Sequence, residues 1–207
     1  MINKWMVLIF LGSLFFVASL SLIAQEGSVQ APATQADKTD ICSYDRSAIL
    51  ALDERAFDQD LNGGWRTLAR QEPCLEVAAD LIRDYRESHG LESTTLYWHE
   101  GQLRATHGAT AEAIQLFEKS RDVSGADFWG WNIYVNATVA FLNQDKVALV
   151  NAREELARLP KPDDWQPPRD PQGNLMDFTW PPNLNVVDML VACFGQEYKE
   201  AYGRCEK

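Results

Sequence analysis

The sequence predicts an all-α protein of antiparallel helical pairs, with a proline-rich extended loop and a C-terminal helical hairpin. Apolar residues recur at helical spacing in successive segments that are bounded by cap residues. Past the N-terminal apolar segment, no stretch alternates polar and apolar residues strongly enough to predict a strand. Seven of the nine prolines lie within residues 160–182, where they exclude helix and predict the loop.

The first 24 residues predict export across a membrane. Lys4 precedes an uncharged apolar run over residues 5–24, which is typical of a secretory signal. A run of about 20 residues is also long enough to be an uncleaved membrane anchor, so both alternatives stay open. Residues 25–39 have almost no large apolar side chain and predict a flexible linker. Residues 40–207 are then of single-domain length and predict one helical domain.

Helical elements are expected in order along that domain. A glycine pair at residues 63–64 ends the first helix. Gly90 and Gly108 are expected to be left-handed C-cap residues that end two later helices. Side chains that accept backbone hydrogen bonds begin others, as Asp127, Asp145 and Asn185 are expected to do. The expected helical segments are residues 47–59, 65–70, 75–89, 94–106, 110–122, 127–141, 146–159, 186–194 and 198–205.

Four cysteines follow the N-terminal segment, and an even number in an exported chain predicts disulfides. Three pairings are possible. We expect Cys42–Cys74 and Cys193–Cys205, because each pair brackets a short helical stretch. No two cysteines have the close spacing of a structural zinc site, so a metal site is not indicated.

Two segments resemble tetratricopeptide repeats, which are helix–turn–helix units. The matching residues of the first unit, residues 94–122, are Tyr97, Gly101, Gly108, Ala113, Ile114 and Phe117. Those of the second unit, residues 127–159, are Trp131, Ala137, Phe141, Ala148, Ala152 and Leu156. The second unit lacks the turn glycine, so an ordinary antiparallel bundle stays open as the alternative. The segments AFDQDLNGGWR and YWHEGQLRA are also similar to a group of exported bacterial proteins without assigned function.

Composition and motifs exclude several classes of function. The formal net charge of −11 disfavours nucleic acid and anionic lipid as partners. The chain has no nucleophile elbow, phosphate-binding loop or dinucleotide fingerprint, so we expect no catalytic residue, no cofactor and no metal. Carboxylates such as Asp58 and Asp60 are expected on solvated helix faces, and the histidines, such as His99, in structural or surface positions.

Five aromatic residues are the candidate binding groove: Trp129, Trp131, Trp165, Phe178 and Trp180. Stiff, aromatic segments need a surface to pack on, so residues 160–182 are expected to fold back onto the repeats. The resemblance to repeat proteins implies a non-enzymatic protein- or peptide-binding or scaffold protein of the bacterial periplasm or cell envelope. Its partner would be an envelope protein or peptide, with membrane contact only through the N-terminal segment. Two alternatives are an envelope enzyme that acts on peptide or glycan with dispersed acidic residues, and a structural or inhibitory partner of one envelope protein.

Overall fold

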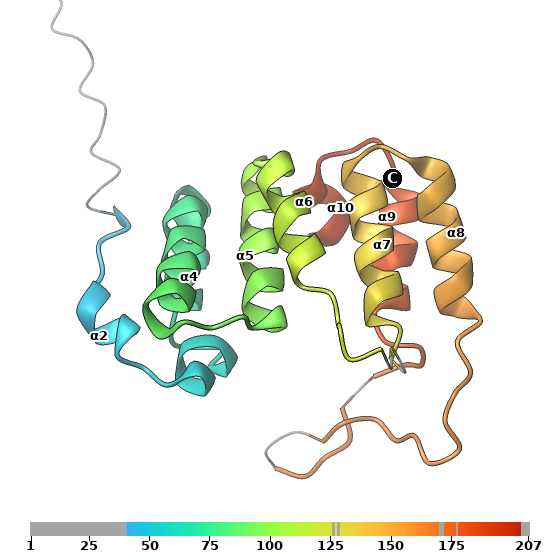
Figure 1. Ribbon diagram of the computed structural model, residues 1–207, viewed down its shortest axis with the longest axis horizontal. Helices are drawn as coiled ribbons and strands as arrows, with labels where there is room; N and C mark the ends of the chain where they lie inside the picture. The colour runs from blue at the N-terminus through green and yellow to red at the C-terminus, as the bar shows by residue number, and fades with distance from the viewer. Residues whose placement is uncertain (1–40, 126, 128, 170–171, 177, 204–207) are drawn as a thin grey trace, which may run out of the picture. The chain divides into compact units, whose positions relative to one another are not determined.

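The computed structural model describes residues 41–203 except 126, 128, 170–171 and 177 (Figure 1). The predicted signal and linker, residues 1–39, and Cys205 lie outside the described residues. The chain divides into two units, Met1–Gln35 and Ala36–Lys207, and everything below concerns the second unit. Of the residues that the structure describes, 61% are helical and none belongs to a strand, which confirms the all-α class. In that part, no helix combines the length and the apolar character that a membrane crossing requires.

The described helical elements follow one another closely. They are α2 (Arg46–Leu50), a π-helical turn η1 (Arg55–Gln59), α3 (Arg66–Ala69), a 3-10 turn η2 (Glu72–Cys74), α4 (Leu75–His89), α5 (Thr94–His107), α6 (Thr110–Lys119), α7 (Trp131–Leu142), α8 (Lys146–Ala157), α9 (Leu184–Ala192) and α10 (Tyr198–Gly203). Sequence neighbours α4 and α5, α5 and α6, and α7 and α8 pack against each other, and α9 packs on α7, α8 and α10 (Figure 1).

Helix α5 is buried on two sides and joins two apolar cores. Leu96 and Leu103 belong to the core that α5 forms with α3 and α4, whereas Trp98 and Ala105 belong to the core of α6 to α10. Gly101, on the same helix, lies against α6, because a Cβ atom there would be 2.9 Å from the Phe117 ring. The small residue therefore permits the close approach of α5 and α6.

A disulfide connects Cys42 with Cys74, whose Cα atoms are 5.5 Å apart, and so ties the chain before α2 to the start of α4. This confirms the first predicted pairing. Cys193 is also disulfide-bonded, but its predicted partner, Cys205, lies outside the described residues.

Several predicted helix boundaries were wrong: α6 ends at Lys119 and α8 at Ala157, earlier than expected, and three further differences are as follows. The helix expected over residues 47–59 is interrupted after α2, because the Asp53 carboxylate accepts a hydrogen bond from the Ala56 amide and starts a separate turn. Helix α7 begins at Trp131 and not at Asp127, because Gly130 has a left-handed backbone (φ 71°) that a helix cannot include. Helix α9 begins directly after Asn183, which has φ 63°, and not after Asn185 as predicted.

Candidate functional site

Between α8 and α9, the described residues 159–183 form no helix. An isolated bridge between Arg169 and Leu175, and a hydrogen bond from the Met176 amide to the Pro168 carbonyl (2.8 Å), fold part of this segment back on itself. The Trp180 indole N–H donates to the Leu159 carbonyl at 3.1 Å, so the far end of the segment is attached to the end of α8. The loop therefore returns to the helices that precede it (Figure 1).

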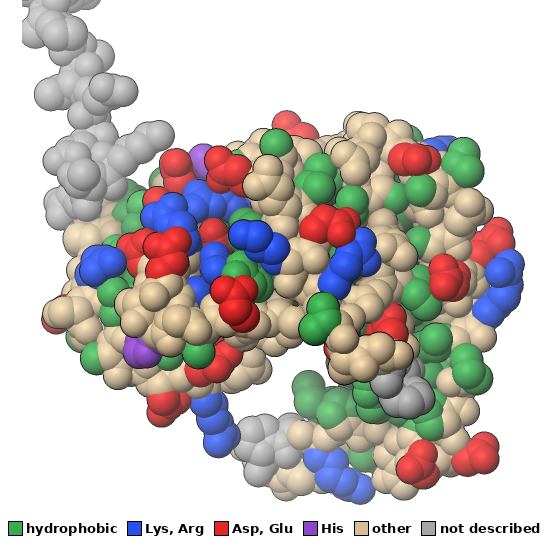
Figure 2. Space-filling model, in the orientation of Figure 1, with side chains coloured by type: hydrophobic (Ala, Val, Ile, Leu, Met, Phe, Trp, Pro, Cys, Tyr) green, Lys and Arg blue, Asp and Glu red, His purple; other side chains and the backbone are tan. Residues whose placement is uncertain are grey.

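This return encloses a cavity of about 350 Å³, which we call the aromatic pocket. Its lining comes from three stretches of chain, and comprises Trp129, Trp131, Trp165, Gln166, Pro168, Phe178, Pro182 and Asn183. Four of the five aromatic residues of the candidate groove thus line one cavity. Trp180 is the fifth, and its ring centroid lies 5.7 Å from those of both Trp129 and Trp165. In Figure 2, a hollow separates the loop from the helical body, and hydrophobic side chains gather beside it.

Part of the pocket wall is fixed by the core. The Trp131 indole N–H donates to the Ser120 carbonyl at 2.7 Å, and its ring packs 4.8 Å from that of the buried Trp98. The mouth of the pocket, by contrast, is open to solvent, since Trp129 is 56% exposed and Phe178 is 40% exposed. Exposed aromatic side chains over a fixed wall are the usual anchors of a binding surface.

A second group of side chains joins residues 56–66 with residues 97–105. Asp58, from the first segment, is buried and accepts hydrogen bonds from the Trp65 indole (2.9 Å) and from Nδ1 of His99 (2.6 Å), which lies in the second segment. Gln59 also donates to the Asp58 carboxylate, and the Arg66 guanidinium lies 3.7 Å from it. The expectation of a solvated Asp58 was therefore wrong. His99 is half-buried.

Gly64 makes this arrangement possible. Its backbone has φ +54°, and a Cβ atom would lie 1.8 Å from the Phe57 carbonyl oxygen, so only glycine fits. Burial raises the pKa of Asp58, but hydrogen bonds from His99 and Trp65 and the positive charge of Arg66 lower it more, and the pKa falls below its usual value. Asp58 is thus a buried carboxylate held in the ionised form by its donors.

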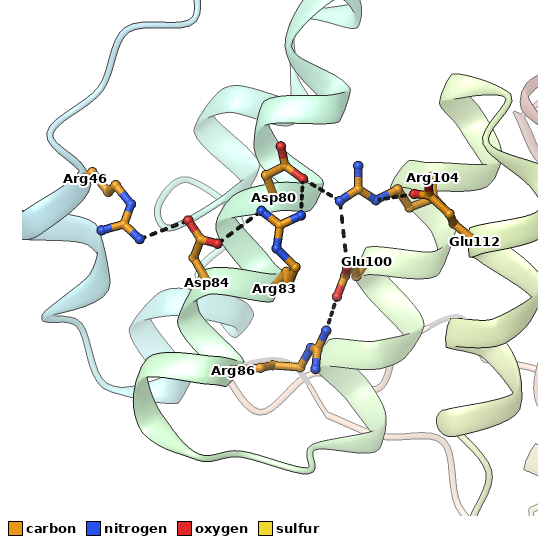
Figure 3. Close-up of polar contacts among 8 residues, drawn as sticks. All are labelled: Arg46, Asp80, Arg83, Asp84, Arg86, Glu100, Arg104 and Glu112. Carbon is orange, nitrogen blue, oxygen red and sulfur yellow. Dashed lines mark hydrogen bonds and ion pairs between the residues drawn. The ribbon is translucent and has the colours of Figure 1, made fainter.

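A network of ion pairs crosses α2, α4, α5 and α6 (Figure 3). Glu100 is buried between Arg86 and Arg104, and burial raises its pKa against the lowering effect of these two arginines. Arg104 also contacts Asp80 at 2.5 Å. The other members are Arg46, Arg83, Asp84 and Glu112. Four arginines face four carboxylates here, so the network neutralises itself and its charges are already paired.

No three metal-ligating side chains converge anywhere in the described residues. His99 and His107 both lie on α5, but they have different partners: Asp58 for His99, and Glu76 at 3.6 Å for His107. His89 lies at the end of α4 and contacts the Leu50 carbonyl at 2.9 Å. Each of these contacts links two different helical elements.

The residues that sequence reasoning missed are of two kinds. Gln166, Pro168, Pro182 and Asn183 line the pocket although nothing in their local pattern marks them. Asp58 is buried, and nothing in its local pattern marks this, since its partner His99 is 41 residues away. Comparison with known proteins assigns no family or function to the chain. No protein-family model matches it, and no match was found among curated proteins or solved structures.

Proposed function

We propose that the protein is a non-enzymatic binding protein of an exported compartment, the bacterial periplasm or cell envelope, and that it holds a protein or peptide partner at the aromatic pocket. The observation that carries the proposal is the lining of the pocket, whose described residues are aromatic and proline side chains with two amides. Ligand sites are typically apolar cavities with a few polar groups. The Cys42–Cys74 disulfide is compatible with an oxidising compartment.

We also propose that α5 to α8 are two tetratricopeptide-like units. Supporting this, α5 packs on α6 and α7 packs on α8. In the first unit, the two matching residues Gly101 and Phe117 are in direct contact, as the repeat pattern requires. The second unit has Gln144 at φ 57° in its turn, where the first has Gly108 at φ 91°. A left-handed residue thus occupies both turns even though the glycine is missing from the second.

Selection of binding peptides from an unbiased displayed library tests the proposal. Peptides selected on the full chain should bind Trp129→Ala about 10-fold or more weakly than the wild type, because truncation of an exposed aromatic anchor typically costs this much. Val147→Ala is the matched control, since Val147 is 72% exposed on α8 and is not a pocket residue. Circular dichroism establishes that both variants fold. Equal binding of selected peptides by the wild type and Trp129→Ala would refute the assignment of the pocket.

The Asp58–His99 pair supports a second candidate, an envelope hydrolase acting on peptide or glycan. A buried carboxylate that holds Nδ1 of a histidine is how proteins orient a general base. The pocket linings that the structure describes do not include His99. Hydrolysis of casein or peptidoglycan by the wild type, lost in His99→Gln with the fold retained, would favour this candidate over the binding protein.

A further inference from the structure

None of the described residues that line the aromatic pocket is charged, in a chain whose formal net charge is −11. Lys161 lies beside the pocket, and its ammonium group is 4.6 Å from the centroid of the Trp165 ring. A charged side chain that entered the pocket would lose its hydration and find no counter-ion in the lining, which is costly. The complementary occupant is therefore an uncharged segment.

We propose that the pocket binds an uncharged, proline-rich peptide segment in the polyproline II conformation; this inference rests on the function proposed above. Such segments bind to grooves lined by aromatic side chains, because the apolar pyrrolidine rings pack against the indole faces. The lining of the pocket already combines prolines with indole rings, since it includes Pro168 and Pro182 together with Trp129, Trp131 and Trp165.

The amides of the pocket suit the backbone of this ligand. A polyproline II helix has no internal hydrogen bonds, so its carbonyl groups need donors from elsewhere. The indole N–H groups of Trp131 and Trp180 are used by Ser120 and Leu159. Counting only partners within the described chain, the side-chain amide of Asn183 donates to none, and it offers two N–H groups to a ligand carbonyl.

The size of the cavity sets the length of the bound segment and the strength of binding. A volume of about 350 Å³ is near the lower end of the usual range for ligand sites, ~300–1,000 Å³. It accommodates about one turn of a polyproline II helix, which is ~3 residues. Because the contact is small, we expect a dissociation constant of ~10–1,000 μM, with a low entropic cost since the ligand is already stiff.

Titration of the full chain with four defined probes tests the inference, with tryptophan fluorescence and calorimetry as readouts. The first probe is a blocked, uncharged octapeptide of proline pairs separated by alanine. The second replaces every proline by alanine, and the third places glutamates between the proline pairs. The fourth is a neutral oligosaccharide of glucose, because stacked aromatic rings also bind sugars.

We expect the proline-rich octapeptide to bind at least 10-fold more tightly than the alanine and glutamate peptides and the oligosaccharide. Trp129→Ala and Phe178→Ala should each weaken that binding about 10-fold, while Val147→Ala leaves it unchanged. Equal affinity for the alanine peptide, or tighter binding of the oligosaccharide, overturns the inference. If peptides selected from the library still require Trp129 but lack proline, the inference fails and the proposed function stands. If no peptide binding depends on Trp129, both fail.

Discussion

Replacement of Asp58 measures how much of the stability depends on one buried carboxylate. In Asp58→Ala, the buried indole of Trp65 and Nδ1 of His99 lose their acceptor, and Arg66 loses its counter-ion. An unpaired buried donor costs about 1–3 kcal/mol, and the loss of one partner of a buried ion pair about 3–5 kcal/mol. We therefore expect the free energy of unfolding to fall by about 3–5 kcal/mol, a large part of the ~5–15 kcal/mol typical of a domain.

Asp58→Asn separates the loss of charge from the loss of the acceptor. The amide keeps one oxygen that can accept from Trp65 or His99, so the expected loss is smaller, about 1–3 kcal/mol. Urea unfolding of the full chain, followed by circular dichroism at neutral pH, gives both values. Asp163→Asn is the control. Its carboxylate is exposed on the loop after α8, and such a surface change should stay within about 0.5 kcal/mol.

The pH dependence of the same comparison has a definite sign. The pKa of Asp58 is below its usual value in the folded protein. Ionised Asp58 therefore contributes stability above the unfolded-state pKa of about 3.9, and this contribution disappears as the pH falls through the folded-state pKa. The difference between the wild type and Asp58→Asn should be constant near neutral pH and should narrow below about pH 4. The reasoning is refuted if Asp58→Ala unfolds at the same urea concentration as Asp163→Asn, or if acid widens the difference.

Three further changes test the packing of the helices by the same urea assay. Cys42→Ser should lower the free energy of unfolding by about 2–5 kcal/mol, the usual cost of a lost native disulfide, and the difference should disappear when both proteins are reduced. Gly64→Ala should cost more than about 2 kcal/mol, since its methyl group would overlap the Phe57 carbonyl; a loss below 0.5 kcal/mol would contradict the left-handed turn. Gly101→Ala should lower the free energy of unfolding by about 1 kcal/mol. Overpacking against the Phe117 ring costs about 1–3 kcal/mol, which exceeds the gain of about 1 kcal/mol in helix propensity. An increase in stability would show that the ring can move aside.

Much of the local structure could be predicted because its causes are local. The all-α class follows from helical spacing, and the ends of α4 and α5 at Gly90 and Gly108 follow from their left-handed backbones (φ 62° and 91°). The Asp145 carboxylate accepts from the Ala148 amide and begins α8 as predicted. The Cys42–Cys74 pairing was one of three possibilities, chosen because the two residues bracket a short helical stretch. Apart from the disulfide, whose cysteines are 32 residues apart, each of these features depends on residues close together in the sequence.

The candidate site could be predicted only in part. Aromatic content after α8 identified Trp165 and Phe178, because rings of that size among prolines need a surface to pack on. The amides and prolines beside them have no such signature, since whether Asn183 lines the pocket depends on how the loop returns to the helices. That return is decided by contacts such as the hydrogen bond from Trp180 to Leu159, which are distant in sequence.

The sequence by itself therefore determined the helices, most of their ends and one disulfide. Only the tertiary structure decided that Asp58 is buried. Its partner His99 is 41 residues away, and no residue close to Asp58 in the sequence indicates that contact. A carboxylate in a polar stretch is solvated by default, and it becomes buried only when distant donors outweigh its lost hydration. The turn at Gly64 allows Trp65 to approach Asp58, and α5 brings His99 to it. The position of this one charge therefore depends on how η1, α3 and α5 pack together.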